Sequence, residues 1–130
     1  MRRRDVYVLL VLGVTIWLAG TLYYHEFGTA ILETTSVRYW SAFVVSPIVS
    51  TLLCVAILKA LGIPPQYWAQ GLLLLAIPGM FGEAAILSNW PVLMSSFGPA
   101  SGGRYGAFLF MTYGVALTVA EMVTLKARSQ

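Results

Sequence analysis

Long apolar stretches alternate with short polar segments along the whole chain. The apolar stretches cover residues 6–24, 39–61, 68–90 and 105–125. Each is long enough to cross a bilayer core about 30 Å thick, because an α-helix rises about 1.5 Å per residue. The pattern predicts an all-α integral membrane protein in which four transmembrane helices form a compact bundle, with residues 1–130 making one domain.

Composition agrees with this pattern and excludes several classes of protein. Hydrophobic residues make up 58% of the chain and charged residues 10%, whereas soluble domains carry about 25% charged residues. The net charge of +3 does not indicate nucleic-acid binding, because the basic residues sit at helix ends and form no continuous patch. The expected surroundings are a lipid bilayer.

The basic residues are divided unequally between the two predicted sides. One side, with both termini and the second connection, holds Arg2, Arg3, Arg4, Lys59, Lys126 and Arg128, and the other holds Arg38 and Arg104. Since basic residues concentrate in cytoplasmic segments, we expect a multi-pass protein of the cytoplasmic (inner) membrane with both termini in the cytoplasm.

Aromatic residues and connections complete the expected topology. Aromatic side chains favour the headgroup level, so we expect Tyr7, Tyr67 and Trp68 at the cytoplasmic interface and Tyr23, Tyr24, Tyr39, Trp40, Trp90 and Tyr105 at the outer one. The first connection, 25–38, permits a short surface helix. The third, 89–103, is rich in Ser, Gly and Pro and should be flexible.

The residue most indicative of function is Glu83, inside the third apolar stretch. It precedes Trp90 by seven residues, which places it about 10 Å below the outer interface. A carboxylate at that depth costs several kcal/mol. Three interpretations remain open: a neutral acid, an ion pair with Arg38 or Arg104, or the lining of a polar cavity that binds a proton, an ion or a ligand.

His25 and Glu26 follow the first apolar stretch and could join Glu83 and the two arginines in one polar cluster on the outer half. One histidine and scattered carboxylates are too few for a metal site. The single cysteine, Cys54, allows no intrachain disulfide. We therefore expect no metal and no cofactor.

Mid-helix prolines indicate helix kinks, either as ordinary kinks or as features of a binding site, and glycines indicate close packing. Pro47 and Pro78 lie mid-helix, where proline frees the carbonyl four residues earlier, while Gly79 and Gly82 thin the helix beside Glu83. Further glycines lie at spacings of four or eight residues: Gly98, Gly102, Gly106 and Gly114. These glycines suit packing within the chain or against another subunit.

The chain resembles a bacterial family of small four-helix membrane proteins of unknown function, DUF5367. The matching residues are the run Ala-Ile-Pro-Gly-Met at 76–80 with Glu83, the run at 106–110 through Tyr113 and Gly114, and the run at 16–22. The resemblance implies aspartate where this chain has Glu83. It implies a fold and no activity, and it draws attention to Pro78, Gly79 and Glu83.

Two classes of function remain open. The first is a homo-oligomeric transporter or channel-like protein for a small solute, ion or proton, which uses Glu83. The second is a non-catalytic accessory subunit that packs against a larger membrane complex. An enzyme is less expected, because no nucleophile elbow, Cys/His pair, P-loop or dinucleotide fingerprint is present.

Overall fold

The computed structural model describes residues 1–130 and contains helices and no strands. The long helices are α1 (Arg3–Phe27), α3 (Ser36–Ala60), α4 (Trp68–Ser88) and α6 (Ser101–Arg128). All four, α4 together with the short turn before it, are long and apolar enough to cross a membrane. Three of them begin earlier than the apolar pattern predicted, because polar residues continue the helix beyond the hydrocarbon layer.

Three short elements join the long helices: α2 (Thr29–Leu32), the 3-10 helix η1 (Pro65–Tyr67) and α5 (Trp90–Leu93). The short helix expected in the first connection is α2. The turn after α3 needs glycine, since Gly62 has a φ of +66°. There the N–H of Ile63 donates to the Leu58 carbonyl and that of Gly62 to the Lys59 carbonyl, which is the Schellman ending of a helix.

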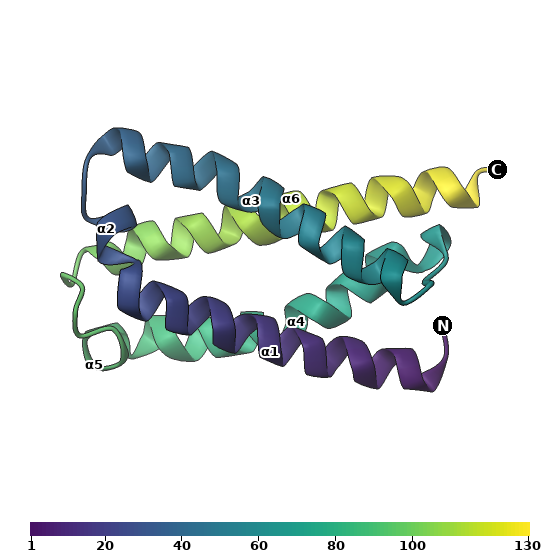
Figure 1. The fold of residues 1–130 in the computed structure, drawn as a ribbon, viewed down its shortest axis with the longest axis horizontal. Coiled ribbons are helices and arrows are strands. Elements are labelled where there is room, and N and C mark those ends of the chain that lie inside the picture. The colour runs from purple at the N-terminus through teal and green to yellow at the C-terminus, as the bar shows by residue number, and fades with distance from the viewer.

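The bundle has two distinct ends (Figure 1). Both termini lie at one end together with η1, which we call the terminal end, and α2 and α5 lie at the opposite end, the loop end. Helix α1 packs against α4, α3 packs against α6, and α4 also packs against α6, whereas α1 and α3 make no substantial contact. The first two crossings are therefore not neighbours.

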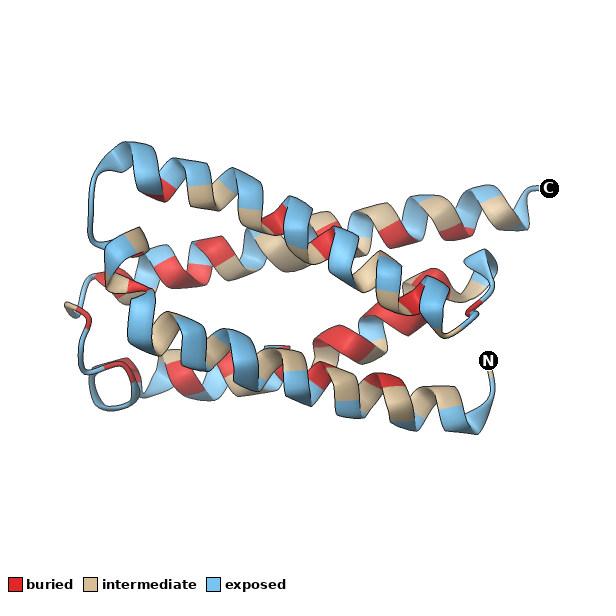
Figure 2. Ribbon diagram, viewed as in Figure 1, coloured by how far each residue is buried: buried red, intermediate tan, exposed pale blue.

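Buried side chains form two separate cores, one toward each end of the bundle (Figure 2). The core of the terminal end consists of Leu9, Leu58, Ile63, Trp68, Leu72, Leu75, Ala116 and Ala120. The core of the loop end consists of Leu32, Tyr39, Ile86, Trp90, Met94, Phe97 and Tyr105. The middle of the bundle belongs to neither core.

Part of the third connection, which its Ser, Gly and Pro content predicts to be flexible, packs into the core of the loop end. Trp90, Met94 and Phe97 are buried in the core of the loop end, and the Trp90 indole N–H donates to the Gly98 carbonyl at 3.2 Å. Large apolar side chains, though few, thus hold part of a segment whose overall composition is that of a loop.

The residues expected in the two aromatic belts differ in exposure. Tyr7, Tyr23 and Trp40 are more than half exposed, as residues facing the headgroups should be. In contrast, Tyr39, Trp68, Trp90 and Tyr105 are buried inside the bundle. Position along a helix gives the depth of a residue but not its direction around the helix axis, and these four point inward.

Both mid-helix prolines are accommodated without a break in the helix. Pro47 lies inside α3 and Pro78 inside α4. The Thr51 hydroxyl donates to the Pro47 carbonyl at 2.7 Å. Helix α4 changes direction near its middle (Figure 1), where Pro78 falls in the sequence.

Candidate functional site

Glu83 is a buried carboxylate with one satisfied oxygen. Its residue is 6% exposed. Oε1 accepts a hydrogen bond from the Tyr105 hydroxyl of α6 at 3.1 Å, while Oε2 is buried and has no hydrogen-bond partner. An unpartnered buried carboxylate oxygen is costly, so this atom is where a function would be expected.

No arginine reaches Glu83. Arg104 donates from Nη1 to the Leu32 carbonyl at 3.0 Å, and its guanidinium lies over the Tyr39 ring, 5.3 Å from the centroid. Arg38 is exposed at the loop end. The ion pair with Glu83, one of the three interpretations of the sequence, is therefore not formed.

Helix α1 presents two further polar groups to the carboxylate. Trp17 and Thr21 face Glu83, and the Trp17 indole nitrogen and the Thr21 hydroxyl are both buried without a hydrogen-bond partner. The two residues are four apart, so they share one face of α1. Two potential donors on α1, the Trp17 indole N–H and the Thr21 hydroxyl, thus face the Glu83 carboxylate without forming a hydrogen bond of good geometry to it.

The glycines of α4 allow this convergence. A Cβ on Gly82 would overlap the Trp17 ring, and a Cβ on Gly79 would overlap the Tyr113 hydroxyl. The sequence predicted that something approaches α4 closely beside Glu83, and aromatic side chains from α1 and α6 do so.

A cavity of about 310 Å³ adjoins these atoms. All four long helices contribute to its 21 lining residues, of which 14 are hydrophobic. Apart from Glu83, its polar lining comes from hydroxyl groups such as those of Ser46, Ser50 and Thr112. It lies between the two cores and shares residues with both.

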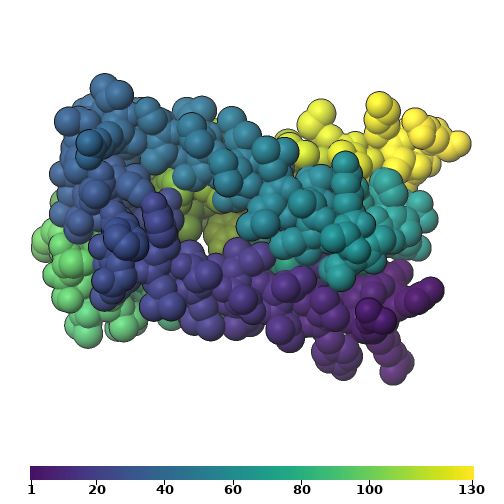
Figure 3. Space-filling view, viewed as in Figure 1, coloured from purple at the N-terminus to yellow at the C-terminus, as the bar shows by residue number.

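The cavity has an opening on the side of the bundle. Figure 3 shows a hollow between α1 and α3, through which part of α6 is visible. Because α1 and α3 make no substantial contact and both are long enough to span a membrane, this opening faces the bilayer and not either aqueous side.

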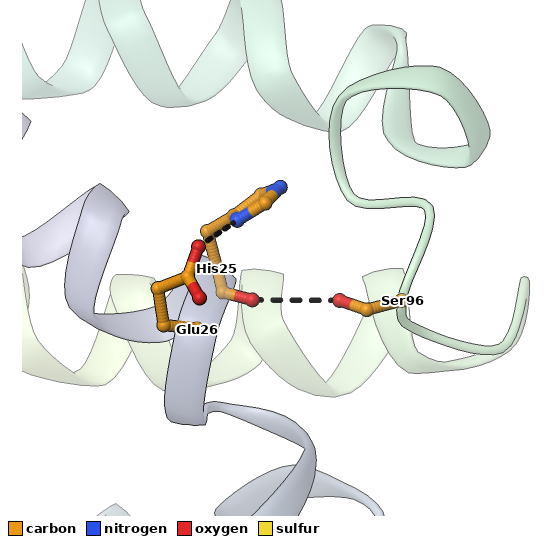
Figure 4. Close-up of polar contacts among 3 residues, drawn as sticks. All are labelled: His25, Glu26 and Ser96. Carbon is orange, nitrogen blue, oxygen red and sulfur yellow. Dashed lines mark hydrogen bonds and ion pairs between the residues drawn. The ribbon is translucent and has the colours of Figure 1, made fainter.

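His25 and Glu26 do not join the cavity (Figure 4). His25 Nδ1 lies 3.0 Å from Glu26 Oε1, and the two side chains are 43% and 66% exposed. The Ser96 hydroxyl donates to the His25 carbonyl at 3.4 Å. The outer cluster expected from the sequence is thus divided: Glu83 is buried, and the other charged residues are at the loop end.

The spaced glycines of the fourth stretch differ in what they contact. A Cβ on Gly102 would meet the Trp90 ring at 3.3 Å, one on Gly98 would meet Glu33 Oε1 at 3.3 Å, and one on Gly106 would meet Leu87 at 3.8 Å. These three glycines serve packing within the chain. A Cβ on Gly114 would meet nothing within 4 Å, so Gly114 has no packing role in the monomer.

Sequence reasoning missed the role of Glu33, whose side chain joins the first and third connections at the loop end. Its Oε1 accepts hydrogen bonds from the Ser101 hydroxyl and the Gly98 N–H, both at 2.5 Å. Both donors lower the pKa of Glu33 below its ordinary value, and the Ser101 hydroxyl has the larger effect. Nothing in the spacing of these residues identifies the contact.

Sequence reasoning also missed Trp17, Thr21 and Tyr105 as neighbours of Glu83. A signal was present on α1, because Gly13, Trp17 and Thr21 follow one another at four-residue spacing and so mark one helix face. Tyr105 had been assigned to the outer membrane interface by its position at a helix end.

The fold and site define an all-helical membrane protein with four potential membrane-spanning helices and a carboxylate buried beside a cavity between them. The sequence model of the family of unknown function DUF5367 matches residues 30–127. The chain belongs to this family, as the runs around Pro78 and Tyr113 predicted. Comparisons with curated proteins and with solved structures find no match.

Proposed function

We propose that this protein is a small membrane transporter in which Glu83 binds a cation or a proton inside the cavity. The observation that carries the proposal is the unpartnered Oε2 of Glu83, at a cavity that no basic side chain lines. A buried carboxylate with a single hydrogen bond is stabilised further by protonation or by pairing with a positive charge. A carboxylate that alternates between the protonated and the cation-paired state can exchange a proton for a cation.

Titratable groups from all four long helices line the cavity. The titratable neighbours that line it with Glu83 are Tyr24 of α1, Cys54 of α3, and Tyr105 and Tyr113 of α6. None of them carries a positive charge. A cation entering the cavity would therefore meet Glu83 as the one group able to neutralise it.

The proposal includes an orientation and an oligomer. Six basic residues on the side of the termini against two on the other favour cytoplasmic termini in a bacterial inner membrane. Four helices around a laterally open cavity enclose no continuous pathway, so we propose that two or more copies assemble to complete one.

Transport is tested in proteoliposomes that contain a trapped pH-sensitive dye. Gradients of Na⁺, K⁺, guanidinium and N-methyl-4-phenylpyridinium are imposed in turn. Because the exchanged proton leaves as the cation enters, at least one gradient should make the lumen alkaline faster than in protein-free vesicles. Responses equal to those of protein-free vesicles for all four cations would overturn the proposal.

Two variants distinguish the effect of losing the Glu83 carboxylate from the effect of losing a carboxylate elsewhere in the protein. Glu83→Gln keeps the shape of the side chain and removes its charge, so the response should be lost. Glu121→Gln makes the same change at an exposed position near the C-terminal end of α6, so its response should equal that of the wild type. A full response in Glu83→Gln would exclude Glu83 as the exchanging group.

An accessory subunit is the second candidate, and one observation favours it. Within the chain, only 11% of the most apolar window of α1 is buried. Helix α1 also makes no substantial contact with α3. A helix of a larger partner could therefore pack between α1 and α3. Purification from native membranes in mild detergent, followed by native mass spectrometry, would reveal a stoichiometric partner. A homo-oligomer without a partner would exclude this candidate.

A further inference from the structure

We infer that the cavity takes a lipophilic organic cation with a single positive charge, which enters from the bilayer between α1 and α3. This inference specifies the substrate class of the proposed transporter, and it rests on that proposal only in taking the Glu83 cavity as a ligand site.

The charge of the ligand follows from the lining of the cavity. No Lys, Arg or His is among the lining residues, and Glu83 is the one carboxylate. Since opposite charges must balance in a medium of low dielectric constant, a single carboxylate matches a single positive charge. An anion or a dication would leave a net charge buried.

The chemistry of the walls favours an organic cation over a metal ion. No group of three or more His, Cys, Asp or Glu residues surrounds the cavity. Instead, the lining includes the aromatic rings of Trp17, Tyr24, Tyr105, Phe108 and Tyr113. Aromatic faces attract cations of low hydration, and quaternary ammonium groups are recognised in this way.

The route of entry follows from the opening. The hollow in Figure 3 lies between two membrane-spanning helices, so a ligand that partitions into the bilayer reaches it directly. Gly20 lines the cavity and is exposed, and a Cβ there would meet nothing within 4 Å. Gly20 therefore adds no side chain to the exposed part of the lining.

The size of the cavity limits the ligand. Its volume of about 310 Å³ is at the lower end of the range of about 300–1,000 Å³ seen for small-molecule pockets. A cation with one or two aromatic rings suits this volume, and we choose N-methyl-4-phenylpyridinium as the probe.

The experiment measures saturable binding of radiolabelled N-methyl-4-phenylpyridinium to the purified full-length chain in mild detergent. The wild type should bind it. The uncharged molecule of the same shape, 4-methylbiphenyl, should not compete, and neither should tetramethylammonium, which has the charge but no ring. Absence of saturable binding, or equal competition by 4-methylbiphenyl, would overturn the inference.

Three variants test the site and its entrance. Glu83→Gln should weaken binding about tenfold or more, because it removes the paired charge. Gly20→Leu should weaken binding to a similar extent, since we expect its side chain to fill the entrance while Glu83 stays in place. Gly114→Leu is the matched control, as Gly114 is an equally open glycine of a membrane helix outside this cavity, and should bind like the wild type.

The outcomes of the two experiments are separable. Glu83-dependent flux of an inorganic cation without pyridinium binding would overturn this inference and leave the proposed function standing. Pyridinium binding without any flux would overturn the proposed function and leave the ligand class standing. Wild-type affinity in both Glu83→Gln and Gly20→Leu would place the ligand elsewhere and overturn the inference.

Discussion

At the scale of single residues, the environment of Glu83 depends on side chains that are distant in the sequence. The acid itself is recognisable from sequence, because a carboxylate inside an apolar stretch is expensive. Its partners are not, since Tyr105 and Trp17 come from other helices, and the rotation of each helix about its axis decides which residues meet. Arg38 and Arg104 lie at the loop end, and neither side chain reaches inward to Glu83.

Tyr105 should stabilise the protein through Glu83. Tyr105→Phe removes the hydrogen bond to Oε1 and leaves both carboxylate oxygens unpaired, so we expect a loss of about 1–3 kcal/mol and a lower melting temperature in detergent. Tyr23→Phe, at an exposed ring, is the control. If Tyr105→Phe lowers stability equally in a Glu83→Leu background, the hydroxyl acts independently of the acid.

Glu33 should make stability depend on pH. Its pKa is lowered in the folded protein, so its contribution is present above its ordinary pKa of 4.5 and is lost as the pH falls through the lower folded value. Melting temperatures of wild type and Glu33→Gln should therefore differ most at about pH 7 and converge as the pH falls below the folded pKa of Glu33. A difference that stays constant across this range of pH would contradict the assignment.

At the scale of elements, the long helices were predictable and the short connections were not. Apolar length alone defines a membrane-spanning helix, and it placed all four. The packing of the third connection could not be predicted, because its composition is that of a loop while Trp90, Met94 and Phe97 are buried in the core of the loop end. Which helices pack together was also beyond the sequence, since all four have apolar faces and no periodic pattern distinguishes a neighbour from lipid.

Gly13 should be essential to the contact between α1 and α4. A Cβ there would overlap the backbone of Leu75, so Gly13→Ala forces the two helices apart and should cost about 1–3 kcal/mol. Gly20→Ala, on the same helix with open space around it, should leave the melting temperature unchanged or slightly higher. Equal effects of the two substitutions would show that the close approach at Gly13 is not required.

At the scale of the whole molecule, the two ends are packed and the middle is hollow. Both termini lie at one end (Figure 1), as four crossings require. The hollow itself could not be predicted, because a cavity is the space that several helices leave unfilled together. The side of the membrane on which the termini lie stays a prediction from the distribution of basic residues.

Orientation is tested with single cysteines in a Cys54→Ala background. Ser95→Cys, in the third connection, should react with a membrane-impermeant maleimide added to intact cells whose outer membrane has been permeabilised. Ser129→Cys, near the C-terminus, should react only after the inner membrane is opened. The reverse pattern would mean that the termini face outward, and labelling of both in intact cells would indicate dual insertion.

The absence of contact between α1 and α3 also has a consequence for biosynthesis. Helices are inserted in the order in which they are made, so the first two arrive in the bilayer before α4, the partner of α1, and α6, the main partner of α3. Until then each must be stable in lipid alone. Their mean hydropathies, 2.0 and 2.3, exceed the 1.7 and 1.6 of the later two spans. The span that carries the buried acid is thus made only after α1, the helix on which it packs, is already in the membrane.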